Sequence, residues 1–85
     1  MFWKAKYIIA DGNIPIVFAE VITHADMARN IGAKSDQIVG AGFVFIEEDG
    51  YKVYGESVSL QVKNRGAEDE RILNKYLGGK QEDDL

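Results

Sequence analysis

The chain has 85 residues, which is enough for one domain and too few for two. It contains no cysteine, which excludes disulfides and thiolate zinc sites. Ten basic residues against fourteen acidic ones give a formal charge of −4, which argues against broad affinity for nucleic acid or anionic lipid. Residues 1–42 carry four of each kind, so the six basic and ten acidic residues of 43–85 account for the whole imbalance.

The sequence also predicts where the protein resides. No stretch approaches the roughly 20 apolar residues that a membrane span needs. Residues 1–6 are interrupted by lysines and lack the continuous apolar segment of a signal peptide. We therefore expect a cytoplasmic protein with no membrane association.

The first half of the chain predicts a β-hairpin followed by a short helix. Residues 3–10 are rich in aromatic and β-branched types, residues 11–13 are a turn signal, and residues 14–22 are almost wholly apolar. Pro15 cannot donate a ladder hydrogen bond, so it should lie at a strand start or on a sheet edge. Thr23 and Asp26 form an arrangement like a capping box, and Gly32 is a natural stop, which predicts a helix of two or three turns.

The second half predicts a hairpin and a longer helix. Residues 38–46 are the most apolar segment and fit a central strand, in which Gly40 and Gly42 share one face and indicate close packing. Residues 49–50 are a turn signal that leads into residues 51–54. Beyond Gly55, which would bend the strand, residues 56–63 alternate with a period of two and predict one wet face. Residues 67–77 place three acids in the first turn and one apolar stripe, as helices do.

This order of elements, ββαββα, predicts an α+β two-layer sandwich. We expect a mostly antiparallel four-stranded sheet with two helices on one face. The single α+β domain should span residues 1–79. Residues 80–85 should form a disordered acidic tail.

Candidate catalytic and metal-binding groups are few. His24 is the only histidine, so every triad or metal-ligand set must use it. Together with Glu20 and Asp26 it could bind a divalent ion, but the simpler interpretation has Asp26 in the helix cap and His24 exposed on the first turn. Ser57 and Ser59 fall on the predicted wet face of a strand, outside the strand-turn-helix elbow of a serine nucleophile. The pattern predicts no enzyme, no metal site and no cofactor.

Two charged features leave alternatives open. Lys63 and Arg65 precede a predicted helix N-terminus, where cations and free N–H groups could capture a phosphate or carboxylate. The acids at 68–70 occupy the same end and would repel an anion. Acidic runs at 47–49, 68–70 and 82–84 could imitate the phosphate spacing of nucleic acid if the fold gathers them. A small-ligand or anion-binding protein is the alternative function.

Aromatic residues give the strongest functional signal. One Trp, four Tyr and four Phe in 85 residues are hard to hide in one thin sheet–helix interface. We expect Phe43 and Phe45, or Tyr51 and Trp3, on an open side of the sheet, where aromatic patches mark protein contact. This predicts a non-enzymatic interaction module, an adaptor or inhibitor, that self-associates as a homo-oligomer, with a homodimer expected. The candidate interaction residues are Trp3, His24, Phe43, Phe45, Tyr51, Tyr54, Ser57 and Ser59.

Four segments, residues 14–18, 24–28, 40–44 and 54–60, carry a resemblance. Together they resemble a group of short bacterial and prophage or phage-encoded proteins, over roughly residues 14–77. The resemblance implies a small cytoplasmic accessory protein that acts on a host or phage component. It assigns no catalytic or binding residue, but it favours residues 24–27 and 54–60 as a binding surface.

Overall fold

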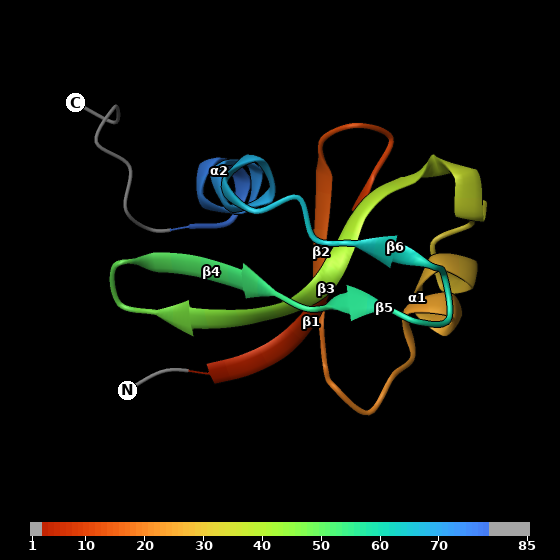
Figure 1. Ribbon diagram of the computed structural model, residues 1–85, viewed down its shortest axis with the longest axis horizontal. Coiled ribbons are helices and arrows are strands. Elements are labelled where there is room, and N and C mark those ends of the chain that lie inside the picture. The colour runs from red at the N-terminus through yellow and green to blue at the C-terminus, as the bar shows by residue number, and fades with distance from the viewer. Residues whose placement is uncertain (1–2, 79–85) are drawn as a thin grey trace.

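The computed structural model describes residues 3–78. In chain order the elements are β1 (Trp3–Ala10), β2 (Ile14–Phe18), α1 (His24–Asn30), the 3₁₀ turn η1 (Ser35–Gln37), β3 (Ile38–Glu47), β4 (Gly50–Tyr54), β5 (Glu56–Ser57), β6 (Val62–Lys63) and α2 (Ala67–Tyr76), as Figure 1 shows. Strands β1 to β4 form an antiparallel sheet in the order β2-β1-β3-β4. The α+β class and the four-stranded sheet are therefore confirmed. The predicted tail at 80–85 lies outside the described residues. Within residues 3–78, neither α-helix has the length and apolar character that crossing a membrane requires.

The turns fall where the sequence predicts them. Asp11 and Gly12 connect β1 to β2 with φ angles of 52° and 88°, in the left-handed region that Asp and Gly tolerate best. Pro15 is the second residue of the edge strand β2, as expected for a residue with no N–H to donate. Gly50 opens β4 directly after the second turn.

The two helices cover opposite faces of the sheet. Tyr7 packs with Leu73 of α2, whereas its neighbour Ile8 packs with Ala28 of α1. Successive side chains of a strand point to opposite faces, so α1 and α2 lie on opposite sides, at opposite ends of the molecule (Figure 1). The expectation that both helices share one face is wrong. Residues 7–10 of β1 are buried on both faces, and helices on one side alone could not bury them.

The segment after Gly55 is a small hairpin, not the long strand that its alternation predicts. Strands β5 and β6 have two residues each, with Ser57 opposite Val62. The chain reverses between them, where Gln61 has a φ of 59° and the Leu60 N–H donates to the Ser57 hydroxyl at 3.0 Å. A serine hydroxyl can thus accept from a backbone N–H that would otherwise donate to a paired strand, and this bond closes a turn.

A buried carboxylate ties α2 to the sheet. The side chain of Asp69 is fully buried, and the Tyr7 hydroxyl of β1 donates to it at 2.6 Å. Arg65 donates to both carboxylate oxygens, from its backbone N–H at 2.9 Å and from Nε at 2.7 Å. Burial, reinforced by the neighbouring carboxylate, raises the pKa of Tyr7, so its hydroxyl stays protonated as the donor. These bonds compensate the cost of burying a charge.

Gly40 of β3 leaves the room for this carboxylate. A Cβ placed on Gly40 would overlap the Asp69 carboxylate. A Cβ on Gly42 would lie 2.7 Å from the Tyr54 carbonyl oxygen. The prediction that these two glycines mark close packing is confirmed.

Helix α2 also closes one edge of the sheet. On the edge strand β4, the Val53 N–H donates to Glu70 Oε2 at 2.9 Å and the Tyr51 N–H donates to Asn74 Oδ1 at 3.1 Å. Both acceptors are side chains of α2. The N–H groups of an edge strand have no neighbouring strand to accept from them. These two side chains accept from the edge N–H groups instead.

We predict that Gly40→Ala destabilises the protein by about 1–3 kcal/mol, because the added methyl group displaces the Asp69 carboxylate from its donors. Urea unfolding at pH 7 measures this change. The adjacent, partly exposed Val39→Ala is the control and should cost clearly less. Equal costs for the two variants would contradict the interpretation.

Candidate interaction surface

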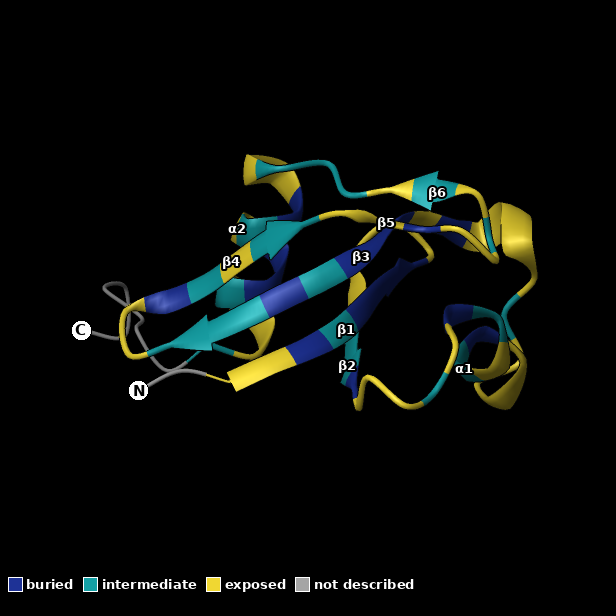
Figure 2. Cartoon of the chain, turned by 60° about the horizontal axis from the view of Figure 1, so that its bottom comes forward, coloured by how far each residue is buried: buried dark blue, intermediate teal, exposed yellow. Residues whose placement is uncertain are grey.

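On the face of the sheet opposite α2, α1 packs over one half only. It covers the end of β1 near Ile8 and Ala10. In Figure 2, β1, β3 and β4 lie in front of α2, and α1 lies beside them. Among the described residues, no helix packs over the remaining half, which we call the open half-face. Its six residues come from β1, β3 and β4: Lys4, Lys6, Phe43, Phe45, Lys52 and Tyr54.

Lysines flank the aromatic rings of the open half-face. Strand register places Lys4, Phe45 and Lys52 in one row, because residues directly opposite in antiparallel strands share a face. The next row contains Lys6, Phe43 and Tyr54 in the same order of strands. Each Phe therefore has a lysine from β1 on one side.

The three rings hold one another in place. Tyr54 stacks on Phe43 with centroids 5.5 Å apart and on Phe45 with centroids 4.7 Å apart, at interplanar angles of 24° and 20°. The Lys6 ammonium lies 5.9 Å from the Phe43 centroid and donates to the Ile22 carbonyl at 2.9 Å. Stacking and hydrogen bonding limit rotamer freedom, so the side chains of this surface are held in one arrangement.

His24 supports this surface from within. It is only 4% exposed, and its ring meets Phe18 and Phe43 edge-on at centroid distances of 5.6 and 5.8 Å. Burial lowers the pKa of His24, so the neutral ring donates from Nε2 to the Gly42 carbonyl oxygen, 2.9 Å away. The expectation of an exposed His24 is wrong, because the first residue of α1 points toward the sheet. His24 is therefore not a surface residue for a partner.

The cluster around His24 does not form a metal site. Thr23 is the N-cap of α1, and its hydroxyl accepts from the Asp26 N–H at 3.0 Å, which confirms the predicted helix start, while the Asp26 carboxylate pairs with Arg29 and not with the cap. Strand β2 ends at Phe18, so Glu20 is an exposed residue of a turn and not part of a strand. Within residues 3–78, no group of three or more His, Asp or Glu side chains could hold a metal ion.

The hydroxyls of the two candidate serines bond within the protein, although Ser59 is exposed. Ser57 is 1% exposed, and its hydroxyl closes the turn between β5 and β6. Ser59 lies on that turn and accepts from the Ala25 N–H of α1 at 3.3 Å. The expectation that both lie on a wet strand face is wrong, because the segment is a turn that packs toward α1.

Trp3 and Tyr51 belong to the other face. Both lie in the row of Ile46, which packs in the cluster under α2. Trp3 is 69% exposed, whereas Tyr51 is partly buried and its hydroxyl donates to the Leu77 carbonyl at 3.4 Å. The structure therefore gathers Phe43, Phe45 and Tyr54 on one surface and places the other predicted pair elsewhere.

Both cations of the predicted anion site have carboxylates of the chain beside or opposite them. Arg65 is engaged by Asp69 and by Glu68, whose carboxylate lies 3.2 Å from Nη1. Lys63 lies opposite Glu56 in the β5–β6 pair. These carboxylates compete with any external anion for the two cations, so an anion site at this loop stays a prediction.

The acidic runs do not form one surface over the described residues. In the run at 68–70, Asp69 is buried and Glu70 accepts from a β4 N–H. The run at 82–84 lies outside the described residues. This leaves Glu47 to Asp49 at the β3–β4 turn, which is too short to imitate a line of phosphates.

The lysines were the part of this surface that sequence reasoning missed. Lys4 and Lys6 stand two residues apart in a predicted strand, which was a signal that they share a face. Lys52 joins them only through the β3–β4 register. Comparisons of the chain with protein-family models, curated proteins and solved structures found no match. The open half-face must therefore be interpreted from its own chemistry.

The buried His24 predicts an effect of pH on stability. Because its folded pKa is lowered from the ordinary 6.5, the unfolded chain binds a proton more readily. Stability should therefore be constant above about pH 7.5 and fall as the pH drops through 6.5 toward the folded pKa. Urea unfolding between pH 8 and 5.5 measures this fall.

The control for this experiment is His24→Gln, which keeps a donor but does not titrate. Its stability should be lower at pH 8 and flat over the same interval. A wild-type slope that persists in His24→Gln would assign the effect to other groups.

Proposed function

We propose that the protein is a non-enzymatic cytoplasmic interaction module that docks a partner protein on the open half-face. The observation that supports this is the placement of three lysines beside three stacked rings on a sheet surface that no described helix covers. Partly buried aromatics beside charged side chains are typical of contact surfaces. The buried positions of His24 and Ser57 leave neither side chain accessible for chemistry on a substrate.

The partner that fits is acidic and apolar at once. The chain as a whole is negative, yet this surface has three lysines, and strand alternation adds Glu47 as the acid at its edge. Carboxylates of a partner would pair with Lys4 and Lys52, both exposed, while its apolar side chains cover the ring edges. Such charge pairs at a rim contribute mainly to association rate and specificity.

A protein partner is favoured over single-stranded nucleic acid. Base binding needs free ring faces on which to stack. Here Tyr54 already stacks on both Phe43 and Phe45, which occupies ring faces that bases would use. A second copy of this chain is also a source of acidic surface, since ten acids lie in residues 43–85. Self-association is thus one form of the proposed function.

The test is a titration followed by NMR amide shifts, with the peptide acetyl-Asp-Leu-Asp-Phe-Asp-Leu-Asp-amide as the probe. We expect shifts at β1, β3 and β4 around the open half-face, and binding that weakens as salt rises. Combined Lys4→Glu and Lys52→Glu should weaken binding by about tenfold or more, since it replaces two attractions with two repulsions. Both lysines are exposed, so the fold should be retained.

Lys34→Glu is the matched control, because Lys34 is an exposed lysine outside the sheet. It should leave peptide binding unchanged. If a peptide with lysine in place of each aspartate bound equally well, the proposal would be contradicted. Tighter binding of a twelve-residue oligothymidylate would contradict it as well. Light scattering of the wild type and of the double charge reversal tells whether a second copy uses the same surface.

A further inference from the structure

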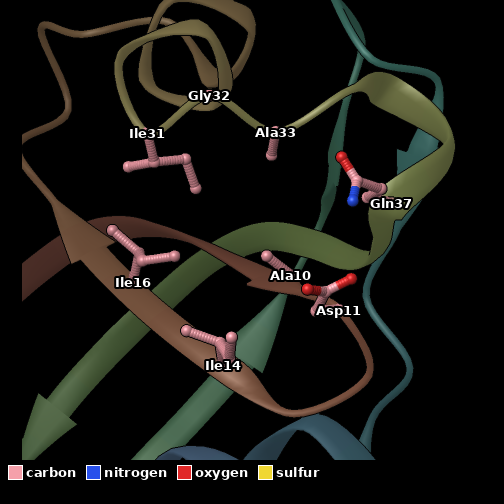
Figure 3. Close-up of a pocket in the computed structure, with 8 residues that line it drawn as sticks. All are labelled: Ala10, Asp11, Ile14, Ile16, Ile31, Gly32, Ala33 and Gln37. Carbon is pink, nitrogen blue, oxygen red and sulfur yellow. The ribbon is translucent and has the colours of Figure 1, made fainter.

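A pocket lies between β2 and the C-terminal end of α1, away from the open half-face. Its volume is about 310 Å³, at the low end of the 300–1,000 Å³ typical of ligand sites. Figure 3 shows Ile14 and Ile16 on one wall and Ile31 on the other. Two of these isoleucines are substantially exposed, Ile14 at 50% and Ile31 at 42%. The pocket is therefore an aliphatic slot with room for one amino-acid residue.

One end of the slot is polar. Asp11 and Gln37 line it there, as Figure 3 shows. The Asp11 N–H donates to the Gln37 backbone carbonyl at 2.9 Å, which fixes the position of Asp11 against η1. Gln37 Oε1 accepts from the Lys34 N–H at 2.8 Å. This bond directs the other amide atom, the donor Nε2, toward the Asp11 side in Figure 3.

The slot thus offers an acceptor with negative charge, a neutral donor and an apolar wall, all within one small volume. The complementary ligand has a cation, a carbonyl oxygen and an aliphatic group on neighbouring atoms. The N-terminal residue of a polypeptide has this combination when its side chain is aliphatic. A free amino acid would add a carboxylate, which Asp11 would repel.

We infer that this pocket captures the aliphatic N-terminal residue of a partner polypeptide. Its side chain lies against Ile14, Ile16 and Ile31. Its α-ammonium pairs with the Asp11 carboxylate, and its carbonyl oxygen accepts from Gln37 Nε2. This inference is independent of the function proposed for the open half-face, which involves other residues.

The test uses L-leucinamide as the probe in an NMR titration of the whole chain. We expect saturable shifts at the residues that line the pocket. N-acetyl-leucinamide lacks the cation, glycinamide lacks the side chain and L-leucine adds a carboxylate. Each should bind about tenfold more weakly, since each removes or opposes one of the three contacts.

Asp11→Asn should weaken leucinamide binding by about tenfold with little effect on stability, because Asn tolerates the positive φ at this position. Asp36→Asn is the matched control, since Asp36 is an exposed acid of η1 that does not line the pocket. It should bind leucinamide as the wild type does.

Three outcomes would overturn the inference. They are the absence of shifts at the pocket, equal binding of leucinamide and its acetylated form, and an Asp11→Asn variant that binds normally. Binding of L-leucine as tight as that of leucinamide would instead show a free amino acid as the ligand, which contradicts the polypeptide N-terminus.

Discussion

The bond between the Tyr7 hydroxyl and the Asp69 carboxylate joins residues 62 positions apart in the chain, and much of the architecture depends on it. It connects the central strand β1 to α2, while Arg65 neutralises the carboxylate and Gly40 leaves space for it. A buried carboxylate without these donors would cost several kcal/mol, so α2 has one favourable position. A purely apolar contact between Leu73 and the sheet would permit sliding, whereas hydrogen bonds with fixed directions do not.

The position of α2 determines which part of the sheet stays uncovered. With α2 on one face, the other face depends on α1 and on the β5–β6 hairpin for cover, and together they reach only its half near Ile8 and Ala41. His24 stands at the boundary between the two halves, with its ring against Phe18 on the covered side and Phe43 on the open side. The open half-face is therefore a consequence of how few elements residues 3–78 form, and its rings are ordered by contact with each other.

Local chemistry was sufficient to predict most elements from the sequence. The turns at Gly12 and Gly50, the edge position of Pro15 and the cap at Thr23 each follow from one residue's backbone preferences. The placement of elements relative to one another was not predictable in this way. The apolar run at residues 7–10 of β1 was a sign in the sequence that both faces of the strand are covered, and these residues are buried. Such a run does not say which helix lies on which face.

Predictions for the candidate residues failed where side-chain bonds decided the outcome. Ser57 fits the alternation of a strand in the sequence, but in the structure its hydroxyl accepts from the Leu60 N–H and closes a turn. The periodicity of the sequence does not reveal that bond. Arg65 has the features of an anion ligand in the sequence, and the sequence does not reveal that its guanidinium donates to the buried Asp69 carboxylate. Phe43 and Phe45 were predicted to share a surface, and strand alternation alone ensures that. Their lysine neighbours needed the register of three strands.

The side chains of Glu70 and Asn74 that cap the β4 edge have a consequence for partial unfolding. If α2 detaches from the sheet, the N–H groups of Tyr51 and Val53 lose their acceptors and the edge strand is left bare. Such an edge is a template on which a strand from a neighbouring chain can assemble. The contact of one ten-residue helix therefore protects the sheet against aggregation through β4.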